Sequence, residues 1–432
     1  MNHQSFLFPL LLSAAAFAGI TPNLELADTV YLPNGTKSAG LSDNLLYTQV
    51  SDTAFAFNVG VGHSKLFVTW RTTPYEAWAN DITTSCGHCE IPLSDFKLLA
   101  SANSTTGFDG DWDTVATIQG NPVSSRGVLI NFTGKTWLRF SIAKSTAVYD
   151  ARVFDASNGT EDTWFFLGTS ITQMAFNGNA PDTLFAQHVT ALVPTNTPAV
   201  VFGGVGCVNS TEIVSHISTY TTYAGNVHFW AIEMGTNDVW GGGDRNLATY
   251  ISNMQTTIDS AKAHGITPVI ARIPATDSAV AGWQVNAKVL TSLDSLIEVN
   301  DLPSGPDLFN WFKEHPEEHN TDGVHPDAAG AASIQRLWAQ AVVPFYKSTS
   351  SGIVSHRVPA ANFSVAVRGN IVELTGLPGG NVTASLFSLV GQEQEAHSLH
   401  GASGMFESRL PHGTYILQIK SYAGIRRASV RL

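Results

Sequence analysis

Three residues, far apart in this 432-residue chain, have the side chains needed for acyl transfer. Ser170 ends a short apolar run, and Asp322 and His325 lie far downstream. A serine hydroxyl is a poor nucleophile at neutral pH, so a histidine must accept its proton and a carboxylate must hold that histidine in the correct tautomer. The order Ser, Asp, His therefore predicts a catalytic triad of Ser170, Asp322 and His325.

Two further blocks could bind the negative charge that develops on a carbonyl oxygen during acyl transfer. Gly204 follows the apolar run 199–202, and Asn237 follows the apolar run 227–232. Removing a single donor to such an oxygen costs about 3 to 4 kcal/mol of transition-state stabilisation. The sequence predicts an oxyanion hole made by the backbone NH groups of Ser170 and Gly204 and by the side-chain amide of Asn237.

Together the four blocks resemble the SGNH, or GDSL-type, hydrolase family, including carbohydrate esterases such as acetyl xylan esterases. The resemblance covers about residues 163–346 and implies that Ser170 is the nucleophile and that Gly204 and Asn237 are oxyanion donors. Such a triad calls for no metal and no cofactor. Two departures are Thr169, where the family pattern has Asp, and Phe202, where it often has Asn. Each block alone also suits an ordinary turn, but their shared order favours catalysis.

The elements between these blocks predict an α/β fold, specifically a three-layer α/β/α sandwich over residues 159–346. Apolar strand candidates alternate with amphipathic stretches, which is typical of a parallel sheet with crossover helices. The segment 247–261 has apolar residues at helical spacing, and Gly265 is a plausible stop. Ligands of open parallel sheets bind at the carboxyl ends of the strands, where all three predicted oxyanion donors fall.

The chain is long enough for about three domains. Residues 1–18 resemble a secretory signal peptide, so we expect a secreted or cell-surface protein. Residues 19–158 have short alternating runs, which predict a β-sandwich resembling jelly-roll or galactose-binding-like domains. A polar linker, 347–358, precedes a small β-rich module, 359–432. That module resembles sorting domains of the bacterial type IX export route, although a plain accessory β-sandwich would have the same pattern.

The three cysteines favour a disulfide over a metal site. Cys86 and Cys89 have the spacing of a redox pair or half of a zinc site, but a chain without a second such pair cannot build a four-cysteine zinc site. A local disulfide between Cys86 and Cys89 is favoured in an exported protein. We expect Cys207 to be a buried free thiol.

Charge and composition limit the partners. The net charge is -12 and no basic tract is present, so nucleic acids and anionic membranes are poor partners. Beyond the signal segment, no stretch is apolar and long enough to span a membrane. Four tryptophans in the N-terminal region either stack on sugar rings or belong to the core, namely Trp70, Trp78, Trp112 and Trp137. Nothing in the sequence indicates the oligomeric state.

The predicted function is that of a secreted serine esterase that removes acetyl groups from a xylan-type plant polysaccharide or its oligosaccharides. Trp240, Asp277 and Trp283 follow strand candidates and are predicted to line the substrate pocket, although a packing role is equally open. Two alternatives remain. The same triad would serve a lipase, lysophospholipase or thioesterase, and an inactive hydrolase scaffold would serve a carbohydrate-binding protein.

Overall fold

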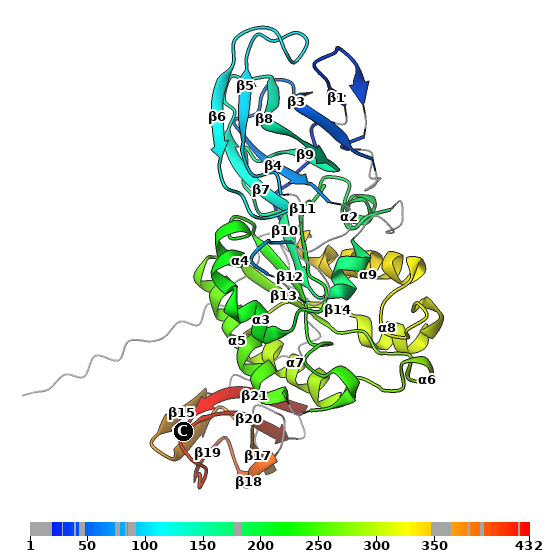
Figure 1. The fold of residues 1–432 in the computed structure, drawn as a ribbon. Helices are drawn as coiled ribbons and strands as arrows, with labels where there is room; N and C mark the ends of the chain where they lie inside the picture. The colour runs from blue at the N-terminus through cyan, green and yellow to red at the C-terminus, as the bar shows by residue number, and fades with distance from the viewer. Residues whose placement is uncertain are drawn as a thin grey trace, which may run out of the picture.

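The structure is a computed structural model of the chain. It describes residues 20–27, 29–38, 40–42, 48–73, 78–82, 84, 92–176, 183–244, 246–346, 364–377, 381–388, 393–421 and 424–432. The predicted signal peptide, the predicted linker and both Cys86 and Cys89 lie outside these residues. The described residues form three bodies stacked along one direction, with the α/β body in the middle and a β body at either end (Figure 1). Among the described residues, no helix is both long and apolar enough to cross a membrane.

The central body is built on a five-stranded parallel sheet in the order β11-β10-β12-β13-β14. Its strands are β10 (Thr163–Gly168), β11 (Ala199–Gly204), β12 (Phe229–Glu233), β13 (Thr267–Arg272) and β14 (Ser304–Asp307). The helices are α1 (Ser170–Ala175), α2 (Phe185–Leu192), α3 (Ser210–Ser215), α4 (Ile217–Tyr223), η1 (Trp240–Gly242), α5 (Leu247–Ala263), α6 (Ser278–Ala281), α7 (Ala287–Val299), α8 (Leu308–Glu314), η2 (Pro316–Glu318) and α9 (Ala328–Tyr346).

Apolar side chains project from both faces of this sheet, because helices cover each face. In β10, Trp164 and Phe166 join the buried cluster under α1, α2, α8 and α9, whereas Phe165 and Leu167 join the cluster under α3, α4, α5 and α7. The predicted α/β architecture with a parallel sheet is therefore confirmed. The helix expected over 247–261 is α5, and Gly265 follows it with a φ of 74°.

The N-terminal body consists of two antiparallel sheets, with strand orders β2-β1-β3-β8-β5-β6 and β7-β4-β9. Their strands are β1 (Val30–Tyr31), β2 (Lys37–Ser38), β3 (Val50–Asn58), β4 (Lys65–Arg71), β5 (Phe96–Ser101), β6 (Asp113–Ile118), β7 (Ser125–Asn131), β8 (Trp137–Val148) and β9 (Asp150–Asp155). Side chains from both sheets, such as Phe55 and Val68, share one buried cluster. Trp70, Trp78 and Trp137 are buried, so the core interpretation of these three is correct.

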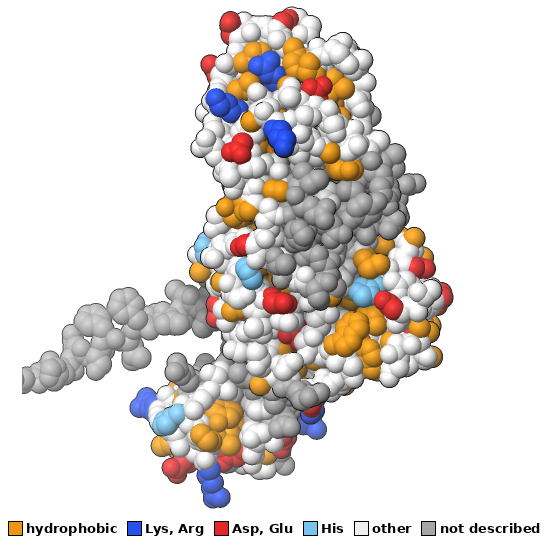
Figure 2. Space-filling model, viewed as in Figure 1, with side chains coloured by type: hydrophobic (Ala, Val, Ile, Leu, Met, Phe, Trp, Pro, Cys, Tyr) orange, Lys and Arg blue, Asp and Glu red, His pale blue; other side chains and the backbone are white. Residues whose placement is uncertain are grey.

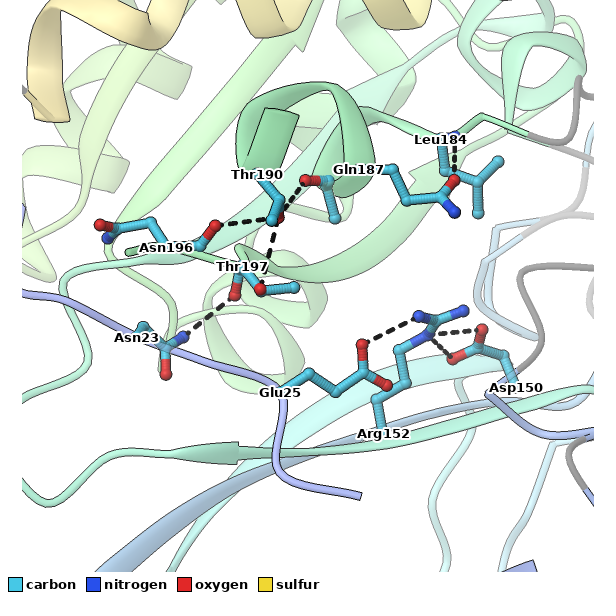
Figure 3. Close-up of polar contacts among 10 residues, drawn as sticks. Asn23, Glu25, Asp150, Arg152, Leu184, Gln187, Thr190, Asn196 and Thr197 are labelled. Carbon is cyan, nitrogen blue, oxygen red and sulfur yellow. Dashed lines mark hydrogen bonds and ion pairs between the residues drawn. The ribbon is translucent and has the colours of Figure 1, made fainter. Parts of the chain in front are cut away.

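Polar contacts join the first described residues to the central body and to β9 (Figure 3). Arg152 lies between two carboxylates, with Nη1 3.2 Å from Glu25 Oε2 and Nε 2.9 Å from Asp150 Oδ2. Nearby, the side chain of Asn23 donates to the carbonyl of Thr197 at 3.4 Å. The N-terminal segment is thus fixed to both bodies.

The C-terminal body also consists of two antiparallel sheets, β15-β16-β19 and β18-β17-β20-β21. The strands are β15 (Ser364–Arg368), β16 (Ile371–Thr375), β17 (Asn381–Phe387), β18 (Glu393–His400), β19 (Ser403–Glu407), β20 (Thr414–Ser421) and β21 (Gly424–Arg431). Val372, Leu386 and Leu417 belong to a buried cluster made only of residues from this body. The domain boundaries predicted at 158/159 and 346/347 fall between the described elements.

Candidate active site

The nucleophile candidate stands at a sharp turn between β10 and α1. Ser170 is the first residue of α1, and Thr169 caps that helix by accepting the NH of Ile171 at 3.2 Å. A Cβ at Gly168 would lie 2.0 Å from the hydroxyl oxygen of Thr172, so only glycine fits at the end of β10. This turn presents Ser170 at the carboxyl edge of the sheet.

The structure brings together the three predicted triad residues. Ser170 Oγ lies 2.8 Å from His325 Nε2, and His325 Nδ1 lies 2.6 Å from Asp322 Oδ2. The ionised carboxylate of Asp322 can only accept a hydrogen bond, so His325 Nδ1 must carry the proton. The lone pair of Nε2 then faces the serine hydroxyl. This is the arrangement that allows His325 to remove the proton of Ser170.

Hydrogen bonds keep Asp322 ionised. Partial burial acts to raise the pKa of this carboxyl, but bonds from His325 and Val324 outweigh it and hold the pKa below the usual value for aspartate. Its Oδ1 accepts the backbone NH groups of Val324 at 2.8 Å and His325 at 3.0 Å. The carboxylate is thus available to orient the imidazole at neutral pH.

The turn that carries Asp322 and His325 is closed on itself and tied to α6. The NH of Asn320 donates to the carbonyl of His325 at 2.8 Å, and the NH of Asp277 donates to the carbonyl of Gly323 at 2.8 Å. Gly323 has a φ of 69°, and a Cβ there would lie 2.9 Å from the carbonyl of Asp277. The Asp277 side chain caps α6 by accepting the NH of Ala279 at 3.0 Å, so this residue supports the triad turn. Its predicted pocket-lining role stays a prediction.

Gly204 and Asn237 lie at the same edge of the sheet as Ser170. Gly168 pairs with Gly204 on one side and with Glu233 on the other, which aligns the ends of β11, β10 and β12. A Cβ at Gly204 would lie 2.4 Å from the backbone nitrogen of Gln173 in α1, so this close approach requires glycine. Asn237 donates one amide hydrogen to the carbonyl of Val208 at 2.7 Å, which fixes the amide and leaves its second hydrogen.

Two tryptophans predicted as pocket residues contact each other. The ring centroids of Trp240 and Trp283 are 5.3 Å apart at an interplanar angle of 52°, and Trp240 is 56% exposed. The carbonyl of Trp283 accepts the hydroxyl of Thr276, the residue before Asp277, at 2.5 Å. Figure 2 shows hydrophobic side chains on both sides of a histidine on the right-hand flank of the central body.

The state of Cys207 differs from the expectation. Cys207 is disulfide-bonded, so the free thiol predicted there is wrong. The hydroxyl of Thr84 donates to the carbonyl of Gly206 at 2.6 Å, which places Thr84 next to the residue before Cys207. The disulfide predicted between Cys86 and Cys89 lies outside the described residues and stays a prediction.

Two charged residues next to this site were missed at the sequence level. Glu233 is a buried carboxyl under the nucleophile turn, and Arg71 is a buried guanidinium that reaches the same helix from β4. A charged residue that ends a mostly apolar strand was the available signal for both, because charged residues are seldom buried without a partner. Within the described part of the chain, no group of three or more His, Cys, Asp or Glu side chains could hold a metal ion.

The central body is therefore an α/β/α sandwich with a Ser-His-Asp arrangement at the carboxyl edge of a parallel sheet, as the resemblance to SGNH hydrolases implies. No protein-family model and no curated protein matches the sequence. Among solved structures, a lipase/acylhydrolase from Enterococcus faecalis is similar, with 18% identity, a TM-score of 0.35, and coverage of 44% of this chain and 99% of the other.

Two other solved structures are similar to this chain. The protein YxiM from Bacillus subtilis has 14% identity and a TM-score of 0.36, and the match covers 67% of this chain and 79% of the other. A variant of an acetyl xylan esterase from Geobacillus stearothermophilus has 17% identity and a TM-score of 0.34, with coverage of 44% of this chain and 96% of the other.

Proposed function

We propose that this protein is an exported serine esterase that removes acetyl groups from a xylan-type plant polysaccharide. One observation carries the esterase chemistry. It is the unbroken chain of hydrogen bonds from Ser170 Oγ through His325 to Asp322, at 2.8 and 2.6 Å. Such a chain raises the nucleophilicity of a serine that is otherwise inert at neutral pH.

In the proposed reaction, His325 Nε2 takes the hydroxyl proton while Ser170 Oγ bonds to the ester carbonyl carbon. The carbonyl oxygen becomes an oxyanion, which accepts hydrogen bonds from the NH groups of Ser170 and Gly204 and from the free amide hydrogen of Asn237. The protonated His325 then gives its proton to the sugar oxygen as the bond between that oxygen and the carbonyl carbon breaks, which leaves an acetyl-serine and a free sugar hydroxyl. Water, deprotonated by the same imidazole, attacks the acetyl carbon. The bond from that carbon to Ser170 Oγ breaks, acetate leaves, and the imidazolium returns its proton to Oγ. Asp322 stabilises the imidazolium in both halves.

An acetylated sugar suits the surroundings of the triad. The exposed ring of Trp240 contacts the half-buried ring of Trp283, whose carbonyl accepts the hydroxyl of Thr276 beside the triad turn, and the face of an exposed aromatic ring packs well against a sugar ring. The net charge of -12 also favours a neutral substrate. The predicted signal peptide and the sorting-like C-terminal module support export. A longer acyl group, or binding without hydrolysis, remains the alternative to be decided by experiment.

The test measures acetate release from acetylated xylan and hydrolysis of p-nitrophenyl esters of rising chain length. We expect Ser170→Ala to lower kcat by about 10⁴-fold or more, because the nucleophile is lost. Ser218→Ala, on the exposed face of α4, is the matched control and should leave kcat unchanged. Preference for long acyl chains would indicate a lipid or thioester substrate. Sugar binding without serine-dependent hydrolysis of any ester would refute the esterase.

A further inference from the structure

A buried carboxyl lies directly under the nucleophile turn and takes no part in the triad. Glu233 is the last residue of β12 and is only 2% exposed. Its Oε2 accepts the hydroxyl of Thr169 at 3.1 Å and the hydroxyl of Thr172 at 3.0 Å. These threonines stand on either side of Ser170. One carboxyl oxygen thus connects the adjacent strand to both flanks of the nucleophile.

Burying the carboxyl of Glu233 at this place lowers the stability of the fold. Its other oxygen, Oε1, is buried without a hydrogen-bond partner among the described residues. Burial raises the pKa of Glu233, and the hydrogen bonds from Thr172 and Thr169 only partly offset that effect. An apolar residue would complete the buried strand β12 at lower cost, since a buried polar atom without a partner is destabilising. The carboxyl therefore has a purpose other than packing.

The hydrogen bonds made by Glu233 determine which NH group at the start of α1 stays free. By donating its own proton to Glu233, the Thr169 hydroxyl turns a lone pair toward the NH of Ile171, which it accepts at 3.2 Å. The NH of Gln173 donates to the carbonyl of Thr169 at 2.9 Å. Among the described residues, the NH of Ser170 has no such acceptor, so it remains available to a substrate oxyanion.

We propose that Glu233 is a positioning residue for the nucleophile. From β12 it supplies the carboxyl that the Gly-Asp-Ser pattern would place at position 169, and it holds Thr169 and Thr172 so that the hydroxyl and NH of Ser170 face the substrate. This inference rests on the proposed esterase function. It does not make Glu233 a catalytic residue, because its carboxyl is hydrogen-bonded to Thr169 and Thr172 and, among the described residues, to neither Ser170 nor His325.

The test compares four variants of the full chain: Glu233→Gln, Glu233→Leu, Thr169→Asp and the double variant Thr169→Asp/Glu233→Gln. Glutamine keeps an acceptor oxygen for both threonines, so kcat should stay within about 5-fold of wild type. Leucine leaves two hydroxyls without an acceptor, and kcat should fall by about 10²-fold with little change in KM, as for loss of an oxyanion donor. Thr169→Asp sets two carboxyls against each other and should be as damaging.

The double variant decides the proposal, because it moves the carboxyl from position 233 to position 169. We expect it to recover at least about 10-fold of the kcat that Thr169→Asp loses, which a purely additive effect would not give. Full activity of Glu233→Leu, or a double variant no better than Thr169→Asp, would overturn the proposal. If Glu233→Leu does not fold, the comparison of Thr169→Asp with the double variant still tests the positioning role of Glu233.

A second readout separates this proposal from the esterase proposal. A fluorophosphonate probe labels an activated serine without turnover, so its labelling rate reports on Ser170 and its oxyanion donors whatever the natural substrate is. The variants should rank by labelling rate as they rank by kcat. Absence of labelling in the wild-type protein would refute the activated Ser170 itself. Labelling at wild-type rate in a folded Glu233→Leu variant would refute only the positioning role.

Discussion

The two β bodies are attached to the central body in different ways. On the N-terminal side, Phe67 and Trp78 belong to the same buried cluster as the sheet and helices of the central body. The ring of Trp78 stacks on that of Tyr220 with centroids 4.8 Å apart. On the C-terminal side, the buried cluster contains no residue of the central body, and a cavity of about 600 Å³ lies between Ile416 and the helices α5 and α7.

This difference indicates that the N-terminal sandwich shares a core with the central body, whereas the C-terminal body has a core of its own. β11 is an edge strand of the parallel sheet and carries Gly204, and an open edge invites wrong pairing. β4 and β7 cover it, with the NH of Phe202 donating to the hydroxyl of Ser125 at 3.0 Å. The N-terminal sandwich therefore shields the strand that holds a predicted oxyanion donor.

Arg71 is the residue that links the N-terminal sandwich most directly to the nucleophile helix. It is only 4% exposed at the end of β4, and its guanidinium lies 4.5 Å from the ring centre of Phe202. It donates to the carbonyl of Thr73 at 2.6 Å and to the carbonyl of Phe176, which ends α1. Burial lowers the pKa of Arg71 to about 10, so it stays charged at neutral pH.

The largest expected effect is that of Arg71→Met. Methionine fills similar space but removes the guanidinium that donates to the carbonyl of Phe176, so the free energy of unfolding should fall by about 2 to 4 kcal/mol. Because Phe176 ends α1, kcat should fall as well. Urea denaturation and ester hydrolysis measure both. Lys97→Met, exposed on β5, is the control and should change neither. An Arg71→Met protein as stable as wild type would show that the two bodies are not coupled through this residue.

The sequence was informative where chemistry depends on local spacing. Asp322 and His325 are three residues apart, so the pattern itself places both on one turn, and the strand runs before Ser170 and Gly204 predicted the shared edge of the sheet. Glu233 and Arg71 were missed because they contact the two ends of α1, which lie far from them in the sequence. The error at Cys207 has a similar cause, since local spacing does not determine whether a cysteine is disulfide-bonded.

The next prediction concerns Asp162, which links the first strand of the central body to the end of its last helix. This buried carboxyl accepts the hydroxyl of Tyr346 at 2.7 Å, the indole NH of Trp164 at 3.0 Å and the amide of Asn196 at 3.0 Å. Burial is the main cause that raises its pKa to about 6, and the three hydrogen bonds offset only part of that effect. No comparable buried link to the C-terminal body is present among the described residues.

This pKa has a definite consequence for stability. Between about pH 4 and pH 6, the folded protein keeps a proton on Asp162 that the unfolded chain has released, so the free energy of unfolding falls as pH rises through this window. Asp162→Asn cannot titrate. Relative to that variant, the free energy of unfolding of the wild-type protein should fall by at most about 3 kcal/mol between pH 4 and pH 6. Urea unfolding at several pH values measures this difference. Asp259→Asn, exposed on α5, is the control. Parallel curves for wild type and Asp162→Asn would contradict the assignment.

The smallest effect is expected from removing the C-terminal body. A chain that ends in the predicted linker, at residue 352, keeps Tyr346 and its bond to Asp162. It exposes the side of α7 that contacts β21 and the sides of α5 and α7 that face the cavity, which Ile251 and Leu296 line. We expect kcat on p-nitrophenyl acetate within about 2-fold of wild type and a shift in Tm of a few degrees at most. A loss of activity as large as that of Arg71→Met would mean that the C-terminal body acts on the site as the N-terminal sandwich does, and the contrast between the two would be lost.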